Sequence, residues 1–225
     1  MTVLSTPRHP LVKAAFRDAR ALYGDHQVED RPALAHSAAV AAALVRHVPD
    51  ASAELTAAAL LHDAPEFAPA GVDVPVFLAG RYGEQTAHVV LALAAEHQAL
   101  DQPDPPIDTT DYPVLLLSTV DKAVAFRSNI DRARRTGDAG AYFAAKVALV
   151  NLLDYFRAYH QAGLGLLPET LCQEYGQAIS GVDTALREHA RTTHIKQSGH
   201  PGARRRTREP GYLACVPAEA LGHFV

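Results

Sequence analysis

Four ionisable side chains stand at positions that helical periodicity assigns to apolar faces. His36 shares the apolar face of one predicted helix, His62 and Asp63 end the apolar stretch ELTAAALL, and Asp121 interrupts a third apolar stripe. A carboxylate buried without a partner costs several kcal/mol, so both aspartates need a cation or hydrogen-bond donors. Two imidazole nitrogens and two carboxylate oxygens form a mixed set that suits Mn, Fe, Zn, Co or Ni. We therefore expect a shared divalent metal ion.

Glu66 adds a possible base to this set. It follows His62 by four residues and Asp63 by three, so the three side chains share one side of the helix end. A metal lowers the pKa of a bound water, and a nearby carboxylate can accept the proton, which is the chemistry of phosphoester or phosphoanhydride hydrolysis. With 12 histidines in the chain, a lone His-Asp pair is expected by chance, and hydrogen-bonded core residues are the competing interpretation. The context of the pair favours a metal site.

The elements that must position these residues are helices. Prolines and glycines separate alanine- and leucine-rich stretches, and Asp30, Ser52, Asp111 and Asp138 stand where helix N-caps are expected. Pro65 should end or kink the helix that carries His62. The predicted helices cover approximately residues 10–22, 32–48, 53–64, 83–100, 112–136, 139–162 and 168–192. Residues 25–31, 67–80 and 101–110 are predicted loops, and the fold class is all-α.

Length and composition set the wider frame. With 225 residues, 48% of them hydrophobic, the chain suits one domain over residues 1–194, followed by a basic tail over 195–225 that lacks the apolar residues to order itself. The net charge of −4 does not favour a nucleic-acid partner, and a solvated tail is expected rather than one that binds RNA. Two cysteines without a CxxC motif, and no apolar run long enough for a bilayer, predict a cytoplasmic protein without a membrane partner. Nothing in the sequence indicates an oligomeric state.

The pattern H…HD…D resembles that of the HD-domain metal-dependent phosphohydrolases. Its members here are His36, the pair His62-Asp63 in LLHDAPE, and Asp121 in STVDKAVAFRSN. From about residue 10 to 161 the chain is most similar to the small alarmone hydrolases, stand-alone relatives of the hydrolase domain of bifunctional (p)ppGpp synthetase/hydrolases. The resemblance implies an HD helical bundle and a 3'-pyrophosphohydrolase of (p)ppGpp-like nucleotides. It also implies that the four residues bind Mn²⁺, with Asp63 and Glu66 in catalysis and Glu66 activating the attacking water.

Two positions depart from the alarmone pattern and keep alternatives open. Phe67 stands where those enzymes have a second acid, and Ala125 where they have an asparagine. The HDxxE form and the His36-Ser37 pair also resemble HD-type nucleoside 5'-monophosphate phosphatases, and a degenerate module that binds a nucleotide without turnover is a third possibility. The candidate partners for substrate phosphates are Lys122, Arg127, Arg20 and Arg31.

The remaining motifs are weak. His88 and His97 lack acids at ligand spacing, so we expect ordinary surface or core histidines there. The sequence contains no GxxxxGK, GxSxG or HExxH motif, which leaves P-loop, serine-hydrolase and zincin chemistry without support.

Overall fold

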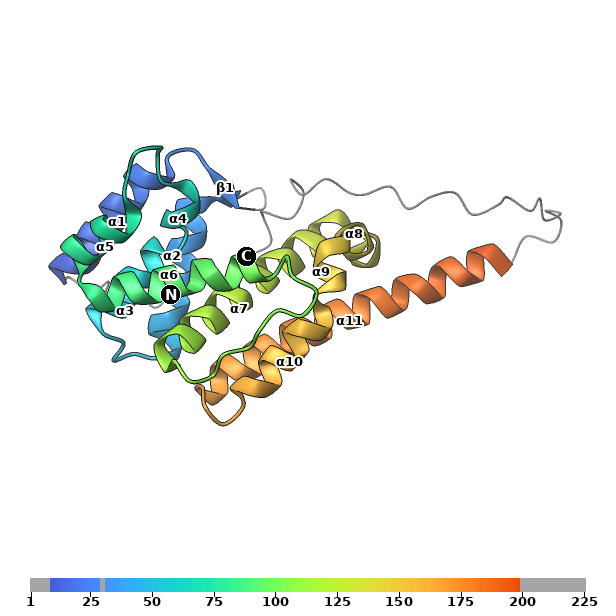
Figure 1. The fold of residues 1–225 in the computed structure, drawn as a ribbon. Coiled ribbons are helices and arrows are strands. Elements are labelled where there is room, and N and C mark those ends of the chain that lie inside the picture. The colour runs from blue at the N-terminus through green and yellow to red at the C-terminus, as the bar shows by residue number, and fades with distance from the viewer. Residues whose placement is uncertain (1–8, 29–30, 199–225) are drawn as a thin grey trace.

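Helices make up most of the computed structural model, which describes residues 9–28 and 31–198 (Figure 1). The helices are α1 Pro10–Tyr23, α2 Ala33–His47, α3 Ala53–Leu61, α4 Ala64–Phe67, α5 Val74–Tyr82, α6 Glu84–Ala99, α7 Tyr112–Thr136, α8 Ala139–Ala145, α9 Val147–Asn151, α10 Leu153–Gly163 and α11 Glu169–Ser198. The described strands, β1 Gln27–Val28 and β2 Arg31–Pro32, pair antiparallel. The predicted all-α class is confirmed.

Local capping explains where several helices begin. The Ser52 hydroxyl accepts a hydrogen bond from the Leu55 amide at 3.1 Å, and the Asp111 carboxylate accepts one from the Val114 amide at 3.3 Å. Asp138 caps α8 in the same way. Each cap satisfies an amide that has no partner inside its own helix. These caps confirm three predicted helix starts, whereas Asp30 lies outside the described residues.

Helix α7 is the central element of the bundle. It packs against α2, α3, α6, α8 and α11, and it runs between the N-terminal helices and the C-terminal helices in Figure 1. Three successive leucines of α7, Leu115, Leu116 and Leu117, are all buried, because neighbours surround the helix on most sides. Burying one such side chain stabilises the fold by roughly 1.5–3 kcal/mol. Asp121 and Lys122 follow on the same buried stretch.

The structure corrects the prediction for residues 67–80. This segment is not a continuous loop, because α5 begins inside it at Val74. The Asp73 carboxylate caps the Val76 amide at 3.1 Å, and Pro75 stands in the first turn, where a proline needs no amide donor. The Pro- and Val-rich composition that suggested a loop is therefore the start of a helix. Between residues 25 and 32, the short β1–β2 pairing takes the place of a plain loop.

The long helix predicted from residue 139 is also wrong in part. The chain leaves helical geometry at Lys146 (φ −92°, ψ 69°) and turns again at Leu152, which divides the segment into α8, α9 and α10. Both α8 and α10 pack against α11, and the breaks allow the two segments to reach it separately.

The last helix, α11, continues to Ser198, past the expected end near Thr192. It therefore crosses the predicted boundary at residue 195, and its C-terminal part projects from the bundle in Figure 1. The rest of the predicted tail, residues 199–225, lies outside the described residues. Among the described helices, none combines the length and the apolar character that crossing a membrane would require.

Candidate metal centre

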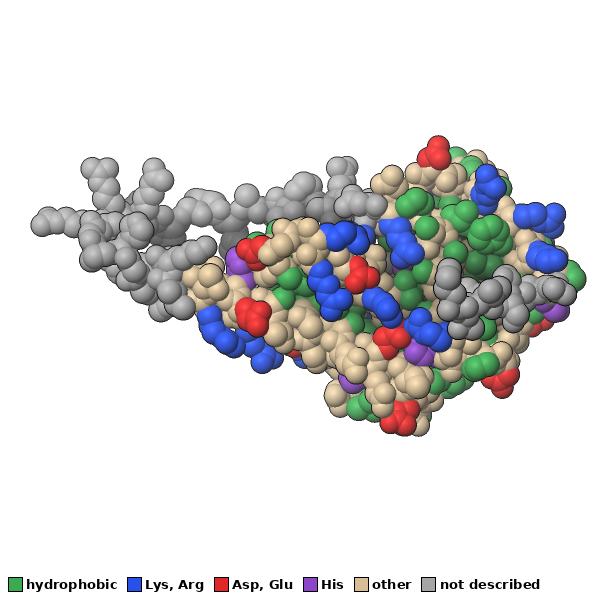
Figure 2. Space-filling model, turned by 180° about the vertical axis from the view of Figure 1, so that it is seen from behind, with side chains coloured by type: hydrophobic (Ala, Val, Ile, Leu, Met, Phe, Trp, Pro, Cys, Tyr) green, Lys and Arg blue, Asp and Glu red, His purple; other side chains and the backbone are tan. Residues whose placement is uncertain are grey.

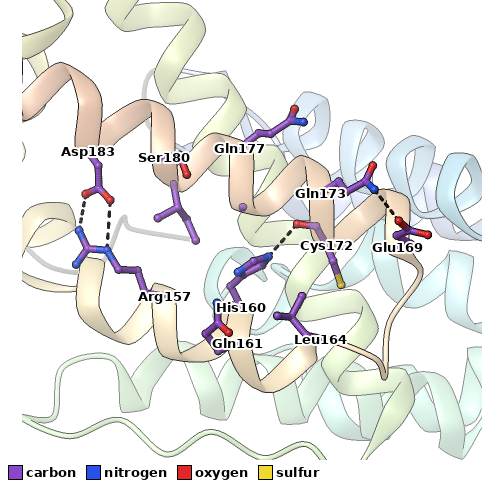
Figure 3. Close-up of a pocket in the computed structure, with 12 residues that line it drawn as sticks. Arg157, His160, Gln161, Leu164, Glu169, Cys172, Gln173, Gln177, Ser180 and Asp183 are labelled. Atoms are coloured by element: carbon purple, nitrogen blue, oxygen red, sulfur yellow. Dashed lines mark hydrogen bonds and ion pairs between the residues drawn. The ribbon is translucent and has the colours of Figure 1, made fainter.

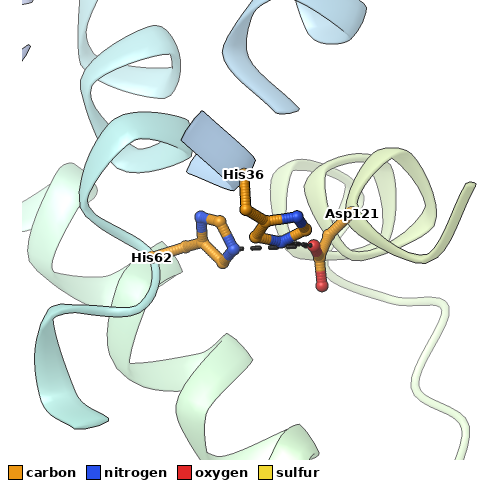
Figure 4. Close-up of side chains that lie close together, drawn as sticks. All are labelled: His36, His62 and Asp121. Atoms are coloured by element: carbon orange, nitrogen blue, oxygen red, sulfur yellow. Dashed lines mark hydrogen bonds and ion pairs between the residues drawn. The ribbon is translucent and has the colours of Figure 1, made fainter. Parts of the chain in front are cut away.

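The four predicted ligands lie in or beside four helices, and three of them, His36, His62 and Asp121, form one cluster. His36 lies one turn into α2, His62 directly follows α3, Asp63 precedes α4, and Asp121 lies in the middle of α7. Figure 4 shows His36, His62 and Asp121. The exposed fractions of the four predicted ligands, in chain order, are 2%, 1%, 3% and 0%. One ligand atom each from His36, His62 and Asp121 falls within 4.8 Å of the others, which is close enough for a shared ion.

The carboxylate oxygens lie at the centre of this cluster. The Nε2 atom of His36 is 2.8 Å from Oδ1 of Asp121, and the Nε2 atom of His62 is 3.5 Å from the same oxygen. The Nε2 atom of His62 is also 3.1 Å from Oδ1 of Asp63. Figure 4 shows both imidazole rings directed toward Asp121.

The ring orientation of His62 points to a cation at its Nε2 atom. Its Nδ1 atom lies 2.9 Å from the carbonyl oxygen of Ala59, which can only accept, so Nδ1 donates. In the neutral ring, Nε2 then carries a lone pair that faces the Asp63 and Asp121 carboxylates. Such an arrangement is stable only with a proton or a metal ion on Nε2. Burial lowers the pKa of His62, but the negative charge of Asp63 and the facing Asp121 carboxylate outweigh it and raise this pKa to about 9.

Unpartnered buried atoms test whether the site fits a metal. Oδ2 of Asp63, Oδ2 of Asp121 and Nε2 of His62 are buried and make no hydrogen bond within the described residues. An unsatisfied buried polar group costs roughly 1–3 kcal/mol, so such a concentration requires an explanation. A divalent cation would occupy these lone pairs, and the nitrogen and oxygen donors match Mn²⁺ and its neighbours in the first transition series. The residues present therefore fit a metal ion.

Asp121 remains ionised in this environment. Burial alone would raise the pKa of its carboxyl group, but the hydrogen bond to His36 and the facing imidazoles of His62 and His97 hold that pKa well below its usual range. The cluster thus offers a permanent negative charge to a cation.

Phe67 is a buried aromatic residue at the end of α4. Its ring lies 6.0 Å from the ring of Tyr23 in an edge contact and 5.1 Å from the ring of His26 in a stacked one, and its side chain is buried. Tyr23 is itself buried and donates to the carbonyl oxygen of Leu60 at 2.8 Å. At the position where alarmone hydrolases have a second acid, this chain therefore has a packing residue.

Glu66 occupies a different environment from the four ligands. It is exposed on α4, the short helix that begins directly after Asp63. A carboxylate that accepts a proton from water and passes it to solvent is compatible with this position. Its role as the base stays a prediction.

Lys122, predicted to contact substrate phosphate, is buried and paired. Its Nζ atom lies 2.5 Å from Oε1 of Glu96 and 2.8 Å from the Ser118 hydroxyl, and it sits 4.7 Å from the centre of the Tyr159 ring. Glu96 also accepts hydrogen bonds from Ser118 and from Tyr155. The ammonium group is thus committed to an internal network.

The other predicted phosphate partners lie nearer the surface. Arg127 has a side chain that is 63% exposed and pairs with Glu174 at 3.2 Å. Arg20 is exposed on α1, and Arg31 is half-buried on β2. Burial, and then the charge of Arg132, lower the pKa of Arg31. Their contact with substrate stays a prediction, and Figure 2 shows Lys and Arg side chains interspersed with Asp and Glu on the face that it presents.

His97 is the site residue that sequence reasoning missed. Its Nε2 atom faces Oδ2 of Asp121 at 3.5 Å, whereas His36 and His62 face Oδ1. A signal was present, because Val90, Leu93 and His97 follow the i, i+3, i+7 spacing of one helix face, and both apolar members are fully buried. His88, in contrast, is exposed and pairs with Asp111, as expected for a surface histidine.

A second hollow lies between α10 and α11. This open groove has a volume of about 930 Å³, and its lining includes Arg157, His160 and Gln177 (Figure 3). Two of its polar side chains are paired, since Arg157 pairs with Asp183 and the His160 ring bonds to the Cys172 carbonyl oxygen at 2.9 Å. None of the predicted site residues lines it.

Comparison with known proteins adds no relative to this description. The chain matches no protein-family model and no curated protein sequence. The functional interpretation therefore depends on the geometry of the His36, His62, Asp63 and Asp121 cluster.

Proposed function

We propose that this protein is a metal-dependent phosphohydrolase that acts on a nucleotide. The observation that carries the proposal is the concentration of buried, unpartnered ligand atoms on His62, Asp63 and Asp121, beside the Nε2 atom of His36. A purely structural cluster would have satisfied those atoms within the fold. Unsatisfied atoms of this kind mark a place prepared for a cation.

We assign four residues to metal binding and one to proton transfer. His36, His62, Asp63 and Asp121 would hold the ion, which we propose to be Mn²⁺. When bound, a divalent cation lowers the pKa of water and neutralises charge on a phosphoryl oxygen. Glu66, exposed directly beyond Asp63, would orient the attacking water and take its proton. Burial of these four residues holds their imidazole nitrogens and carboxylate oxygens in a fixed arrangement.

The favoured reaction is release of pyrophosphate from a (p)ppGpp-like nucleotide. This finer statement is supported by the resemblance of LLHDAPE and STVDKAVAFRSN to the motifs of small alarmone hydrolases. The four residues of that pattern are all buried, and His36, His62 and Asp121 each offer one ligand atom within 4.8 Å of the others, which supports the proposal.

A second candidate is a nucleoside 5'-monophosphate phosphatase. Phe67 favours it, because the buried ring takes the place of the second acid of alarmone hydrolases and packs on Tyr23 and His26. Glu66 would then act on the attacking water without a second acid next to it in the sequence.

The test is product analysis with the full-length protein and Mn²⁺. The panel is ppGpp, pppGpp, ppApp, NADPH and nucleoside 5'-monophosphates. We expect pyrophosphate from an alarmone, and we expect Asp63→Asn to lower kcat/KM by at least about 100-fold, because it removes a ligand charge. Orthophosphate from a monophosphate or from NADPH would move the protein to the second candidate.

A matched control is Glu84→Gln, which removes one exposed carboxylate at the start of α6 and should leave turnover unchanged. If the protein binds Mn²⁺ and a nucleotide but turns over no member of the panel, the proposal of hydrolysis is overturned in favour of a binding module. Turnover that persists in Asp63→Asn would also contradict it.

A further inference from the structure

The two oxygens of Asp121 face different groups. Oδ1 faces the Nε2 atoms of His36 and His62, at 2.8 and 3.5 Å. Oδ2 faces the Nε2 atom of His97 at 3.5 Å. Within the described residues, neither Oδ2 of Asp121 nor Nε2 of His97 makes a hydrogen bond. The carboxylate is fully buried, so solvent does not supply a donor for Oδ2.

Metal binding changes which imidazoles can donate a hydrogen bond to the Asp121 carboxylate. A histidine that coordinates a metal through Nε2 has no proton left on that atom, so it no longer donates to the carboxylate. If His36 and His62 bind the ion through Nε2, neither can donate a hydrogen bond to Asp121. Of the three histidines whose rings face this carboxylate, His97 is the one that still has Nε2 available for donation.

We propose that His97 is a positioning residue, which donates from Nε2 to Oδ2 of Asp121 and so directs Oδ1 toward the metal. This inference rests on the proposed metal site and extends it by one residue. Groups that orient a metal ligand in this way typically contribute 10- to 100-fold to metal affinity.

The neighbour of His97 explains why its ring is held in place. Glu96 accepts hydrogen bonds through Oε1 from Lys122 at 2.5 Å, from Ser118 at 3.0 Å and from Tyr155 at 3.2 Å. Lys122 and Ser118 flank Asp121 on α7. The end of α6 is therefore tied to the same turns of α7 that carry the carboxylate, and this tie sets His97 opposite Asp121.

The experiment measures Mn²⁺ affinity by titration calorimetry on the full chain. His97→Leu removes the donor, whereas His97→Gln keeps an N–H donor on a side chain of similar reach. We expect a 10- to 100-fold weaker Kd in His97→Leu, and a Kd within about threefold of the unmodified protein in His97→Gln. His88→Leu, which changes the exposed histidine of the same helix, is the matched control and should leave the Kd unchanged.

Visible absorption of the Co²⁺-loaded proteins separates positioning from direct ligation. At saturating Co²⁺ all the variants should show the same band positions, because the ligand set is unchanged. Shifted bands in both His97 variants would identify His97 as a ligand and overturn the proposal, as would a Kd in His97→Leu within threefold of the unmodified protein. If the unmodified protein binds neither metal, the proposed function itself fails. Circular dichroism of metal-free His97→Leu checks that the fold is retained.

Discussion

Asp121 and Lys122 are neighbours on α7, and each belongs to a buried polar cluster. The two clusters differ in how many of their buried polar atoms make hydrogen bonds. Lys122 contacts Glu96, Ser118 and the Tyr159 ring, and Glu96 accepts from three donors. We call this set, Glu96, Ser118, Lys122, Tyr155 and Tyr159, the Lys122 network. Around Asp121, four buried atoms make no hydrogen bond within the described residues: His62 Nε2, Asp63 Oδ2, His97 Nε2 and Asp121 Oδ2.

This difference indicates a structural role for the Lys122 network and supports the proposed cation site at Asp121. A buried ion pair whose hydrogen bonds are complete holds two helices in register and needs nothing from outside the chain. A buried cluster with unsatisfied lone pairs lowers the stability of the fold until something occupies it. The same helix thus supplies a structural ion pair at residue 122 and a residue of the proposed cation site at position 121.

The largest effect on stability is expected from breaking the Lys122–Glu96 ion pair. Lys122→Met leaves Glu96 buried without its cation, and we expect the free energy of unfolding to fall by roughly 3–5 kcal/mol. Urea denaturation of the metal-free protein measures this change. The double variant Lys122→Met/Glu96→Gln removes both charges and should recover most of the loss. If the single and double variants are equally unstable, the charge pair is not what stabilises this region.

A smaller effect is expected from filling the cation site. At a Mn²⁺ concentration of 100 times Kd, binding should stabilise the protein by about 2.7 kcal/mol, and EDTA should reverse the gain. Thermal denaturation with and without Mn²⁺ measures it.

Asp121→Asn should remove this stabilisation, because the amide oxygen carries no charge to offer the ion. Tyr155→Phe is the matched control, since it removes one hydrogen bond from the Lys122 network and touches none of the proposed ligands. A Mn²⁺-induced gain that survives in Asp121→Asn would place the ion elsewhere.

The smallest effect is expected from pH in the metal-free protein. The pKa of His62 is raised to about 9 in the fold, against about 6.5 in the unfolded chain, so the folded state holds a proton that the unfolded state releases. The stabilisation is complete below about pH 6.5 and is lost as the pH rises toward 9, with a slope of about 1 kcal/mol per pH unit between pH 7 and 8.

Urea denaturation at pH 7 and pH 8 in EDTA tests this dependence. His62→Gln should flatten the slope. Lys122 adds no slope in this range, because burial lowers its pKa but Glu96 outweighs burial and raises it above the ordinary value. Stability that rises from pH 7 to pH 8 would contradict a protonated His62.

Local signals account for the parts of the fold that were predicted. Ser52, Asp111 and Asp138 mark helix starts through hydrogen bonds that span three residues, and Pro65 separates α3 from α4 through its missing amide proton. Such effects act within one turn of chain, so they are readable in the sequence. The burial of His36 and Asp121 was readable for the same reason, because periodicity assigns a residue to a face.

Contacts between distant segments account for the parts that were not predicted. His97 and Asp121 are 24 residues apart, and no local rule joins them. Lys122 looked like a phosphate ligand because nothing near it in sequence shows that Glu96, from α6, is its partner. The breaks at Lys146 and Leu152 likewise accompany the separate packing of α8 and α10 on α11.

The sequence by itself determined that this chain is helical and that His36, His62, Asp63 and Asp121 occupy buried faces, because helix periodicity and capping act over a few residues. Only the tertiary structure decided which buried charges neutralise one another and which remain open to a cation. The physical reason is that hydrogen bonding of a buried group depends on what the neighbouring helix presents to it, and that depends on the packing of whole helices.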